Sequence, residues 1–142
     1  MDVINLKNLL RNSISEKISI LEEGENKFRV FSPFYFDDGD RFSIVLKNEN
    51  GNWILSDEGN TYMHLGLSDL EQKIVFNTIL RFDVEDKDGE IIIKIVGGNY
   101  GDAFYNFVQV LLGISFCTYI MEISKRIVNN KEERRIKWVI IH

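Results

Sequence analysis

The segment RFSIVLKNENGNWILSD, residues 41–57, predicts the fold class more clearly than any other part of the chain. Apolar and polar side chains alternate on both sides of Asn50-Gly51, a dipeptide that favours the type I′ turn of a β-hairpin. A two-residue turn places Leu46 opposite Leu55, and Ile44 opposite Asp57. The hairpin then has one apolar face directed at a core, made by Ile44, Leu46, Trp53 and Leu55.

On the amino-terminal side of this hairpin the chain favours one helix and one strand. Residues 2–22 carry apolar side chains at helical spacing, which predicts an amphipathic helix that stops near Gly24. Residues 27–32 predict a strand, which ends at Pro33 because proline lacks the N–H that a sheet requires. The apolar stripe of the helix consists of Leu6, Leu10, Ile14, Ile18 and Leu21.

Three further elements are predicted directly after the hairpin. They are a short helix from Asn60 or Thr61 to Leu65, a second helix from Ser68 to about Leu80, and a hairpin of residues 82–84 and 90–96 around Lys87-Asp88-Gly89. The second helix opens with Ser68-x-x-Glu71, the pattern of a capping box. Its buried candidates are Leu70, Ile74 and Ile79.

The last third of the chain predicts a long helix, capped by Asp102 and extending to about Val128. The alternation of Ile136, Trp138 and Ile140 leaves two alternatives for the last residues, an edge strand or a continuation of the helix. The buried stripe of the long helix consists of Phe104, Phe107, Val108, Leu111, Ile114, Thr118 and Met121.

Runs of strands kept apart from helices are typical of the α+β class. We therefore expect a single α+β domain over residues 1–142. Its mostly antiparallel sheet of about five strands is expected to pack against an N-terminal helix and a long C-terminal helix.

Composition limits the setting in which the protein acts. The 142 residues are 44% hydrophobic, enough to bury a core, and the single cysteine, Cys117, cannot form an internal disulfide. The first residues lack a signal-peptide pattern. The longest apolar stretch, residues 107–121, is shorter than the ~20 residues of a membrane span. A cytoplasmic location in a bacterial host cell, without membrane contact, is expected.

Acidic side chains precede and follow the first hairpin, and clustered carboxylates can hold Mg²⁺ or act as a base. The expected register places Asp40 opposite residue 61, about 13 Å from Asp57 at ~3.3 Å per residue, too far for one shared ion. We therefore expect a solvated turn around Asp40 and a helix-capping role for Asp57. The alternative is a metal- or ligand-dependent enzyme that uses Asp40, Asp57 and Glu58.

Patterns of specific catalysts do not support the enzyme alternative. The hairpin lacks the acid-x-Lys pair of restriction-type nucleases, and Gly97–Gly101 lacks the lysine of a P-loop. His64 and His142 have no cysteine or histidine at metal-ligand spacing. No catalytic residue, metal site or cofactor is expected.

The segment 125–137 is rich in cations, among them Arg126, Arg134 and Arg135. These side chains could contact phosphates or an acidic partner, or could simply form a solvated helix face. A formal net charge of −5 disfavours general nucleic-acid binding, because phosphate contacts require positive charge. Nucleic acid is therefore an unlikely partner.

Three segments together resemble a known family, the domain of unknown function 1828. They are Phe31-Ser32-Pro33-Phe34, Asp38-Gly39-Asp40-Arg41-Phe42-Ser43-Ile44, and Trp53-Ile54-Leu55-Ser56-Asp57-Glu58-Gly59-Asn60-Thr61. Residues 104–114 are similar to the C-terminal helix of that family, and the resemblance covers most of residues 28–115. It implies a small protein of bacterial phages or mobile elements, and it carries over no catalytic role.

The hypothesis that follows is a non-enzymatic accessory protein, of phage origin, that acts by binding another protein, for example by inhibiting a host defence system. One alternative is the enzyme described above. The other is a nucleic-acid-associated regulator that uses the basic C-terminal segment. The sequence leaves the oligomeric state open.

Overall fold

The computed structural model describes residues 2–79 and 83–141, with side chains up to Arg135. One six-stranded sheet, in the order β1-β2-β3-β4-β6-β5, has antiparallel pairing throughout. The α+β prediction is confirmed, with one strand more than expected. The predicted helix end at Leu80, the strand start at Phe82 and the terminal His142 lie outside the described residues.

The hairpin of residues 41–57 forms as predicted in its central part. Strands β3 (Ile44–Glu49) and β4 (Asn52–Ser56) pair with Leu46 opposite Leu55. Asn50 and Gly51 both have positive φ, 54° and 85°, as a type I′ turn requires. The strand begins only at Ile44, however, so Asp40 does not lie opposite residue 61; residues 34–42 instead form a loop with one bridge, Tyr35 to Arg41.

The N-terminal prediction was wrong in its second half. Helix α1 spans Val3–Ser15, and the next residues form strand β1 (Ser19–Gly24), which pairs with β2 (Lys27–Phe31). Ile18 and Leu21 fit helical spacing, but the helix ends at Ser15, and backbone pairing of Leu21 with Arg29 of β2 places Leu21 in a strand. None of the residues of α1, all of which the structure describes, is buried.

The two short helices form close to their predicted positions, as α2 (Asn60–Leu65) and α3 (Asp69–Ile79). The capping box is confirmed, because Glu71 N donates to Ser68 Oγ and Ser68 N donates to Glu71 Oε1. The buried candidates of α3 were partly wrong. Val75 is its buried side chain, whereas Leu70 and Ile74 are exposed.

The strands after α3 are β5 (Val84–Lys87) and β6 (Glu90–Lys94), joined at Asp88-Gly89. The hairpin is confirmed, but its bounds were partly wrong, because the first strand runs to Lys87 and the second ends at Lys94 instead of residue 96. Both turn residues have positive φ, so this hairpin repeats the type I′ geometry of the first. Strand β6 pairs with β4 and brings Ile91, Ile92 and Ile93 into the interior. The second hairpin thereby becomes the other half of the sheet.

The last element is one helix, α4 (Tyr100–Ile141). It begins two residues before the expected cap Asp102, which lies in the first turn, and it continues past Val128 without forming a terminal strand. The buried stripe on its first half packs on the sheet. That stripe contains Ala103, Phe107, Val108, Val110, Leu111, Ile114 and Thr118.

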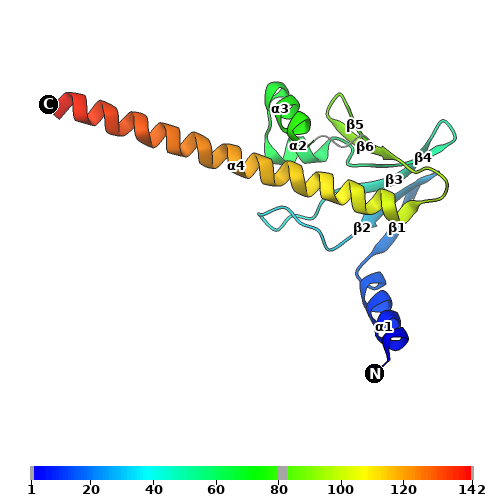
Figure 1. The fold of residues 1–142 in the computed structure, drawn as a ribbon. Helices are drawn as coiled ribbons and strands as arrows, with labels where there is room; N and C mark the ends of the chain where they lie inside the picture. Colours follow the sequence, from blue (N-terminus) through cyan, green and yellow to red (C-terminus); the bar gives the residue numbers. More distant parts are fainter. Residues whose placement is uncertain (1, 80–82, 142) are drawn as a thin grey trace.

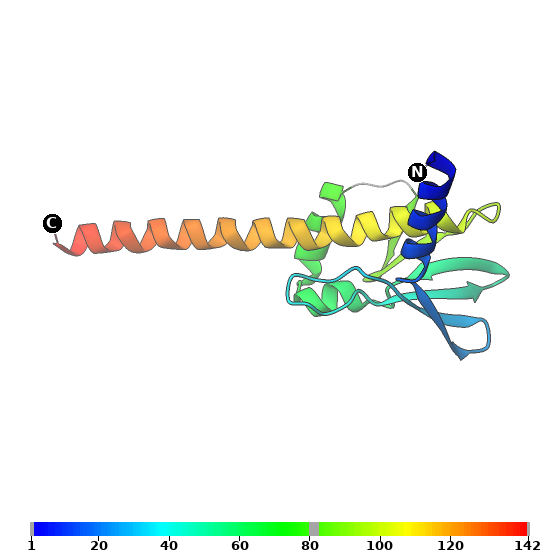
Figure 2. The same ribbon diagram turned by 90° about the horizontal axis from the view of Figure 1, so that it is seen from below.

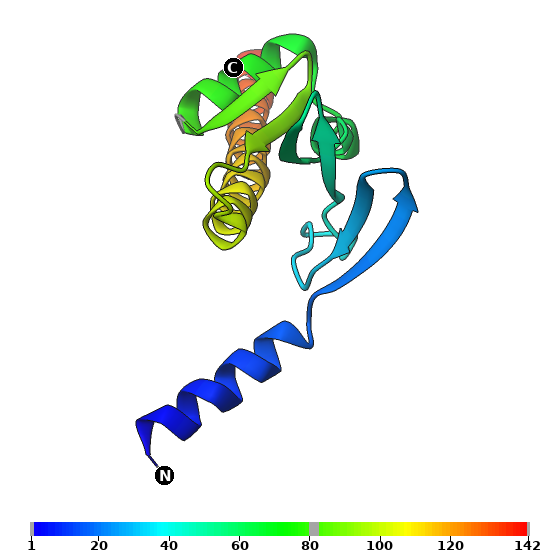
Figure 3. The same cartoon turned by 90° about the vertical axis from the view of Figure 1, so that its right-hand side faces the viewer.

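Both terminal helices extend away from the sheet. Figures 1 and 2 show α4 crossing the sheet and projecting well beyond it. Figure 3 shows α1 leaving the β1 side in another direction. Within the described part of the chain, the stretch Tyr100–Arg135 is long and apolar enough to cross a membrane by length and composition, with 39% of its apolar window buried in the protein. The core helix of a soluble protein has the same character.

One ion pair joins α3 to α4 near the place where α4 leaves the body: Lys125 Nζ lies 2.8 Å from Glu71 Oε2. The hydrogen bond from Lys125, followed by the capping contacts with Ser68, lowers the pKa of Glu71 to about 2. The stabilisation that this carboxylate contributes is therefore present above its unfolded pKa of 4.5 and is lost as the pH falls toward 2.

Replacing Lys125 by methionine should raise the pKa of Glu71 toward its ordinary value, because the largest cause of the shift is removed. NMR titration of the side-chain carboxyl measures this directly. The control is Lys131→Met, on an exposed site of the same helix. An unchanged pKa in Lys125→Met would show that the pair does not form in solution.

Candidate functional site

The carboxylate of Asp57 lies at the junction of β4, α2 and β6 and is completely buried. Its Oδ1 accepts from Gly59 N and Ile91 N, both at 2.9 Å, and its Oδ2 accepts from Thr61 N at 3.1 Å. Two of these donors open α2, where neither predicted cap, Asn60 nor Thr61, occupies the N-cap position, which is Gly59. Asp57 therefore caps the helix from outside it and also fixes β6.

Burial raises the pKa of Asp57, and hydrogen bonds from the Thr61 side chain and from the three backbone N–H donors oppose that rise. A raised pKa means that the folded state holds the proton more tightly than the unfolded chain does. The contribution of Asp57 to stability therefore decreases as the pH rises above about 4, the opposite sign to that of Glu71. Both carboxylate oxygens of Asp57 accept hydrogen bonds from backbone N–H groups, so this side chain is suited to stabilising the fold.

Glu58 is the neighbour of Asp57 in the sequence but contacts a different group. Its Oε2 lies 3.1 Å from Lys27 Nζ and its Oε1 lies 3.4 Å from Arg29 Nη2. Both cations belong to β2, and Arg29 also pairs with Glu23 of β1. Glu58 therefore ties the β4–α2 turn to the outer strands through partly exposed ion pairs.

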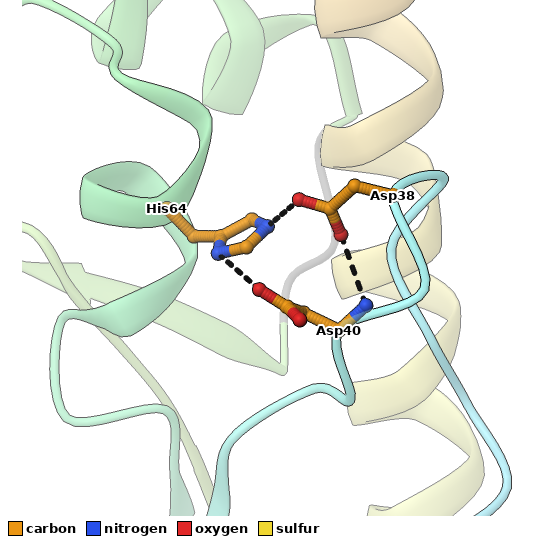
Figure 4. A group of neighbouring side chains, drawn as sticks. All are labelled: Asp38, Asp40 and His64. Atoms are coloured by element: carbon orange, nitrogen blue, oxygen red, sulfur yellow. Dashed lines mark hydrogen bonds and ion pairs between the residues drawn. The ribbon is translucent and has the colours of Figure 1, made fainter.

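Asp40 lies at the other end of α2, where the 34–42 loop contacts the last turn of that helix. His64 Nε2 is 2.7 Å from Asp38 Oδ2, and His64 Nδ1 is 3.7 Å from Asp40 Oδ2, as Figure 4 shows. The imidazole is stacked on Phe36, with ring centroids 4.0 Å apart. A hydrogen bond from the backbone of Asp40, followed by the contact with His64, lowers the pKa of Asp38.

These contacts divide the acidic corner expected from the sequence into two separate groups. Asp57 precedes the first turn of α2, whereas Asp40 contacts the last turn. The sequence did not reveal the participation of His64, because the loop that brings two aspartates to it is set by tertiary contacts.

Among the described residues, Asp38, Asp40 and His64 form the group whose ligand atoms lie close enough for a metal ion, within 4.8 Å of one another. Figure 4 shows that the two carboxylates face different nitrogens of the same ring. An ion on either nitrogen would therefore meet one carboxylate directly, and the second would have to move around the ring. The arrangement fits a hydrogen-bonded clasp between the loop and α2 better than a preformed metal centre.

The predicted basic residues lie on the projecting half of α4, by which we mean the residues that follow Thr118, the last buried residue described in that helix. Arg126, Arg134 and Arg135 are all exposed. They stand on a different part of the molecule from Asp57 and Asp40, so the structure does not unite the acidic and basic candidates in one site.

A large apolar groove was not predicted from the sequence. It has a volume of about 720 Å³ and lies between the end of α1, the sheet and the start of α4. Its floor is made by Val30, Leu46 and Leu55, and its sides include Ile14 and Phe104. The signal in the sequence was the apolar face of the first hairpin, but only the fold shows that part of this face is left uncovered.

Replacing Asp57 by alanine should lower the free energy of unfolding by about 2–4 kcal/mol, because it leaves the buried Ile91 N–H and the first N–H groups of α2 without acceptors. Asp57→Asn should also destabilise, since its amide group turns a donor toward Thr61 N. The control Asp40→Ala should change the value by less than about 0.5 kcal/mol. Urea unfolding of the three variants measures this, and an unchanged stability in Asp57→Ala would contradict the structural role.

Calorimetric titration with Mg²⁺ or Mn²⁺ should show no binding in the micromolar range, because the two carboxylates are directed at separate nitrogens of His64. The matched variants are Asp38→Ala in the clasp and Asp69→Ala, an exposed acid elsewhere. Micromolar binding that disappears in Asp38→Ala and persists in Asp69→Ala would establish a metal site and contradict this expectation.

Comparison with known proteins gives one family. The family model described as "Domain of unknown function DUF1828" matches residues 32–114, which is more than half of the chain. The matched range begins after β2 and ends within the packed half of α4, so that it contains Asp40, Asp57, Glu58 and His64 and leaves out α1. No curated protein and no solved structure matches the chain. The chain is a member of the DUF1828 family.

Proposed function

We propose that this protein is a non-enzymatic accessory protein that acts by binding another protein, and that α1 and the apolar groove form its binding surface. The observation that carries the proposal is an amphipathic helix with no buried residue, placed next to an open apolar groove. Large exposed apolar surfaces on soluble proteins mark sites of interaction.

Helix α1 exposes the stripe that its sequence would direct at a core. Six apolar side chains have exposed fractions between 46% and 79%. Leaving such side chains in water forgoes ~1.5–3 kcal/mol for each one that could be fully buried. The six residues are Val3, Ile4, Leu6, Leu9, Leu10 and Ile14.

The groove continues this stripe into the body of the protein. Ile14 belongs to both surfaces, and Ile20 of β1 lines the groove with 60% of its surface exposed. On the same side of the sheet, α4 covers β4 and β6. A helix laid in the groove would complete the helical layer over the remaining strands, which is the usual way a sheet face is buried.

An amphipathic helix of another protein is therefore the partner that this surface fits. Its apolar side chains would enter the groove while α1 packs along its other side, as in helix-in-groove recognition. Helix α1 offers such a partner helix a contact length of ~20 Å, because its 13 residues rise 1.5 Å each.

The arrangement of the charged residues supports this function over the two alternatives. The oxygens of Asp57 accept backbone hydrogen bonds, and Glu58 is paired with Lys27 and Arg29, which favours structural roles for both acids. A net charge of −5 opposes general binding of nucleic acid. The narrower proposal, a phage protein directed at a defence component, rests on the family resemblance and the small acidic chain.

The proposal is tested by affinity capture from a bacterial lysate, with the tagged full chain and mass spectrometry. The variant Ile14→Asp/Ile20→Asp should lose the captured protein, since both side chains are exposed and line the groove. The control Met63→Asp/Leu70→Asp changes two apolar residues elsewhere that are more exposed than Ile14 and Ile20, and it should retain the captured protein.

Two results would contradict the proposal. The first is capture of the same proteins by wild type and the groove variant. The second is a photo-cross-linker at Leu10 that reacts only within its own chain, at groove residues, because α1 would then close over its own groove.

A further inference from the structure

Helix α4 carries a second apolar face, on the side opposite the one that packs on the sheet. At 100° per residue, six of its side chains fall within an arc of about 100°. Five of these side chains have exposed fractions of 42% to 64%, and the sixth, that of Ile123, is half-buried. The outer stripe, as we call it, consists of Leu112, Phe116, Tyr119, Ile120, Ile123 and Ile127.

The outer stripe extends from the packed half of α4 onto the projecting half. No residue from Tyr119 to Arg135, a range described in full, is buried. The chain covers this half only in part, at Met121 and Ile123, and it leaves Ile120 and Ile127 exposed. An apolar helix face that the chain leaves exposed marks a site of interaction.

We propose that a second copy of this chain covers the outer stripe, with the two α4 helices antiparallel and their two-fold axis between Tyr119 and Ile120. The spacing of the stripe is symmetric about that point. The antiparallel arrangement pairs Leu112 with Ile127, Phe116 with Ile123, and Tyr119 with Ile120. The stripe is thus complementary to itself, as a two-fold interface requires.

Charge favours this orientation over a parallel one. Residues 125–135 contain five cations and two anions, a net charge of +3, and the whole chain carries −5, so the rest of the chain carries −8. Antiparallel helices place the projecting half of each copy over the acidic body of the other. Parallel helices would place two segments of net charge +3 side by side, which is unfavourable.

Individual contacts agree with the charge argument. The pairing places Arg126 opposite position 113 of the other copy, where Asp37 lines a pocket beside Leu112 and Phe116. It also places Arg134 opposite Tyr105, a side chain that is 59% exposed and suited to a cation–π contact. Two of the three basic residues predicted as a binding site, Arg126 and Arg134, thus obtain an acidic and an aromatic partner.

The surface is large enough for association. Burying roughly 80–100 Å² from each of the stripe residues of both copies gives about 1,100 Å², near the ~1,000 Å² that a specific interface needs. The six stripe residues do not line the groove, and of the contacts described here Tyr105 alone belongs to it, so the dimer leaves α1 available for the partner proposed above.

The association state is measured by sedimentation or light scattering of the full chain at micromolar concentrations. Twice the chain mass of 16.6 kDa is expected, with dissociation favoured by added salt. Phe116→Glu/Ile120→Glu should give monomers that keep the wild-type circular dichroism spectrum, since both side chains are exposed. The control Met63→Glu/Val96→Glu changes two apolar residues outside α4 that are more exposed than Phe116 and Ile120, and it should remain dimeric.

Orientation is tested with cysteines in a Cys117→Ser background. A mixture of Leu112→Cys and Ile127→Cys chains should form disulfide-linked heterodimers, whereas each variant alone should link poorly. Efficient linkage of each variant to itself would show a parallel pair and overturn the antiparallel proposal. A monomeric wild type, a dimer unaffected by Phe116→Glu/Ile120→Glu, or recovery of the chain only with membranes or detergent would overturn self-association.

Discussion

The fold depends on one buried carboxylate, Asp57, which connects elements that lie far apart in the sequence. Its oxygens bind N–H groups of α2 and of β6, while its own N–H donates to Ile91 O. The first hairpin, the helix after it and the second hairpin are thereby held in one geometry. Burying a charge is unfavourable unless its hydrogen bonds are satisfied, so the arrangement tolerates few alternatives at this position. The same contacts occupy the lone pairs that a general base or metal ligand would need.

With the centre fixed in this way, the molecule differs most from an ordinary small domain at its two ends. Helix α1 and the second half of α4 both carry apolar side chains and both leave the body. The two surfaces suit different partners. The groove beside α1 is concave and accepts an inserted helix, whereas the outer stripe of α4 is symmetric about its middle and fits a copy of itself. A protein built like this can assemble through one helix and bind a partner with the other.

The features that could be predicted from the sequence depend on contacts within a few residues. Asn50-Gly51 and Asp88-Gly89 favour one turn type whatever surrounds them, and that turn sets the register of Leu46 with Leu55. The capping box of Ser68 and Glu71 likewise closes on itself. The role of Asp57 as a helix cap was visible for the same reason, because Thr61 follows it by four residues. Its bond to Ile91, 34 residues away, was not visible.

By itself the sequence determined the α+β class, the type I′ turn of the first hairpin, the turn position of the second, the short helices and the family membership, since these rest on local pattern. Only the tertiary structure decided that residues 19–24 pair as a strand, because their apolar side chains fit helical and strand spacing alike. The sequence already placed Asp40 apart from Asp57, but only the tertiary structure started β3 at Ile44, left Asp40 in a loop and brought it to His64. The tertiary structure also decided which apolar faces stay uncovered. A stripe in the sequence shows that a face is apolar, but whether another element covers that face depends on where the chain returns in space.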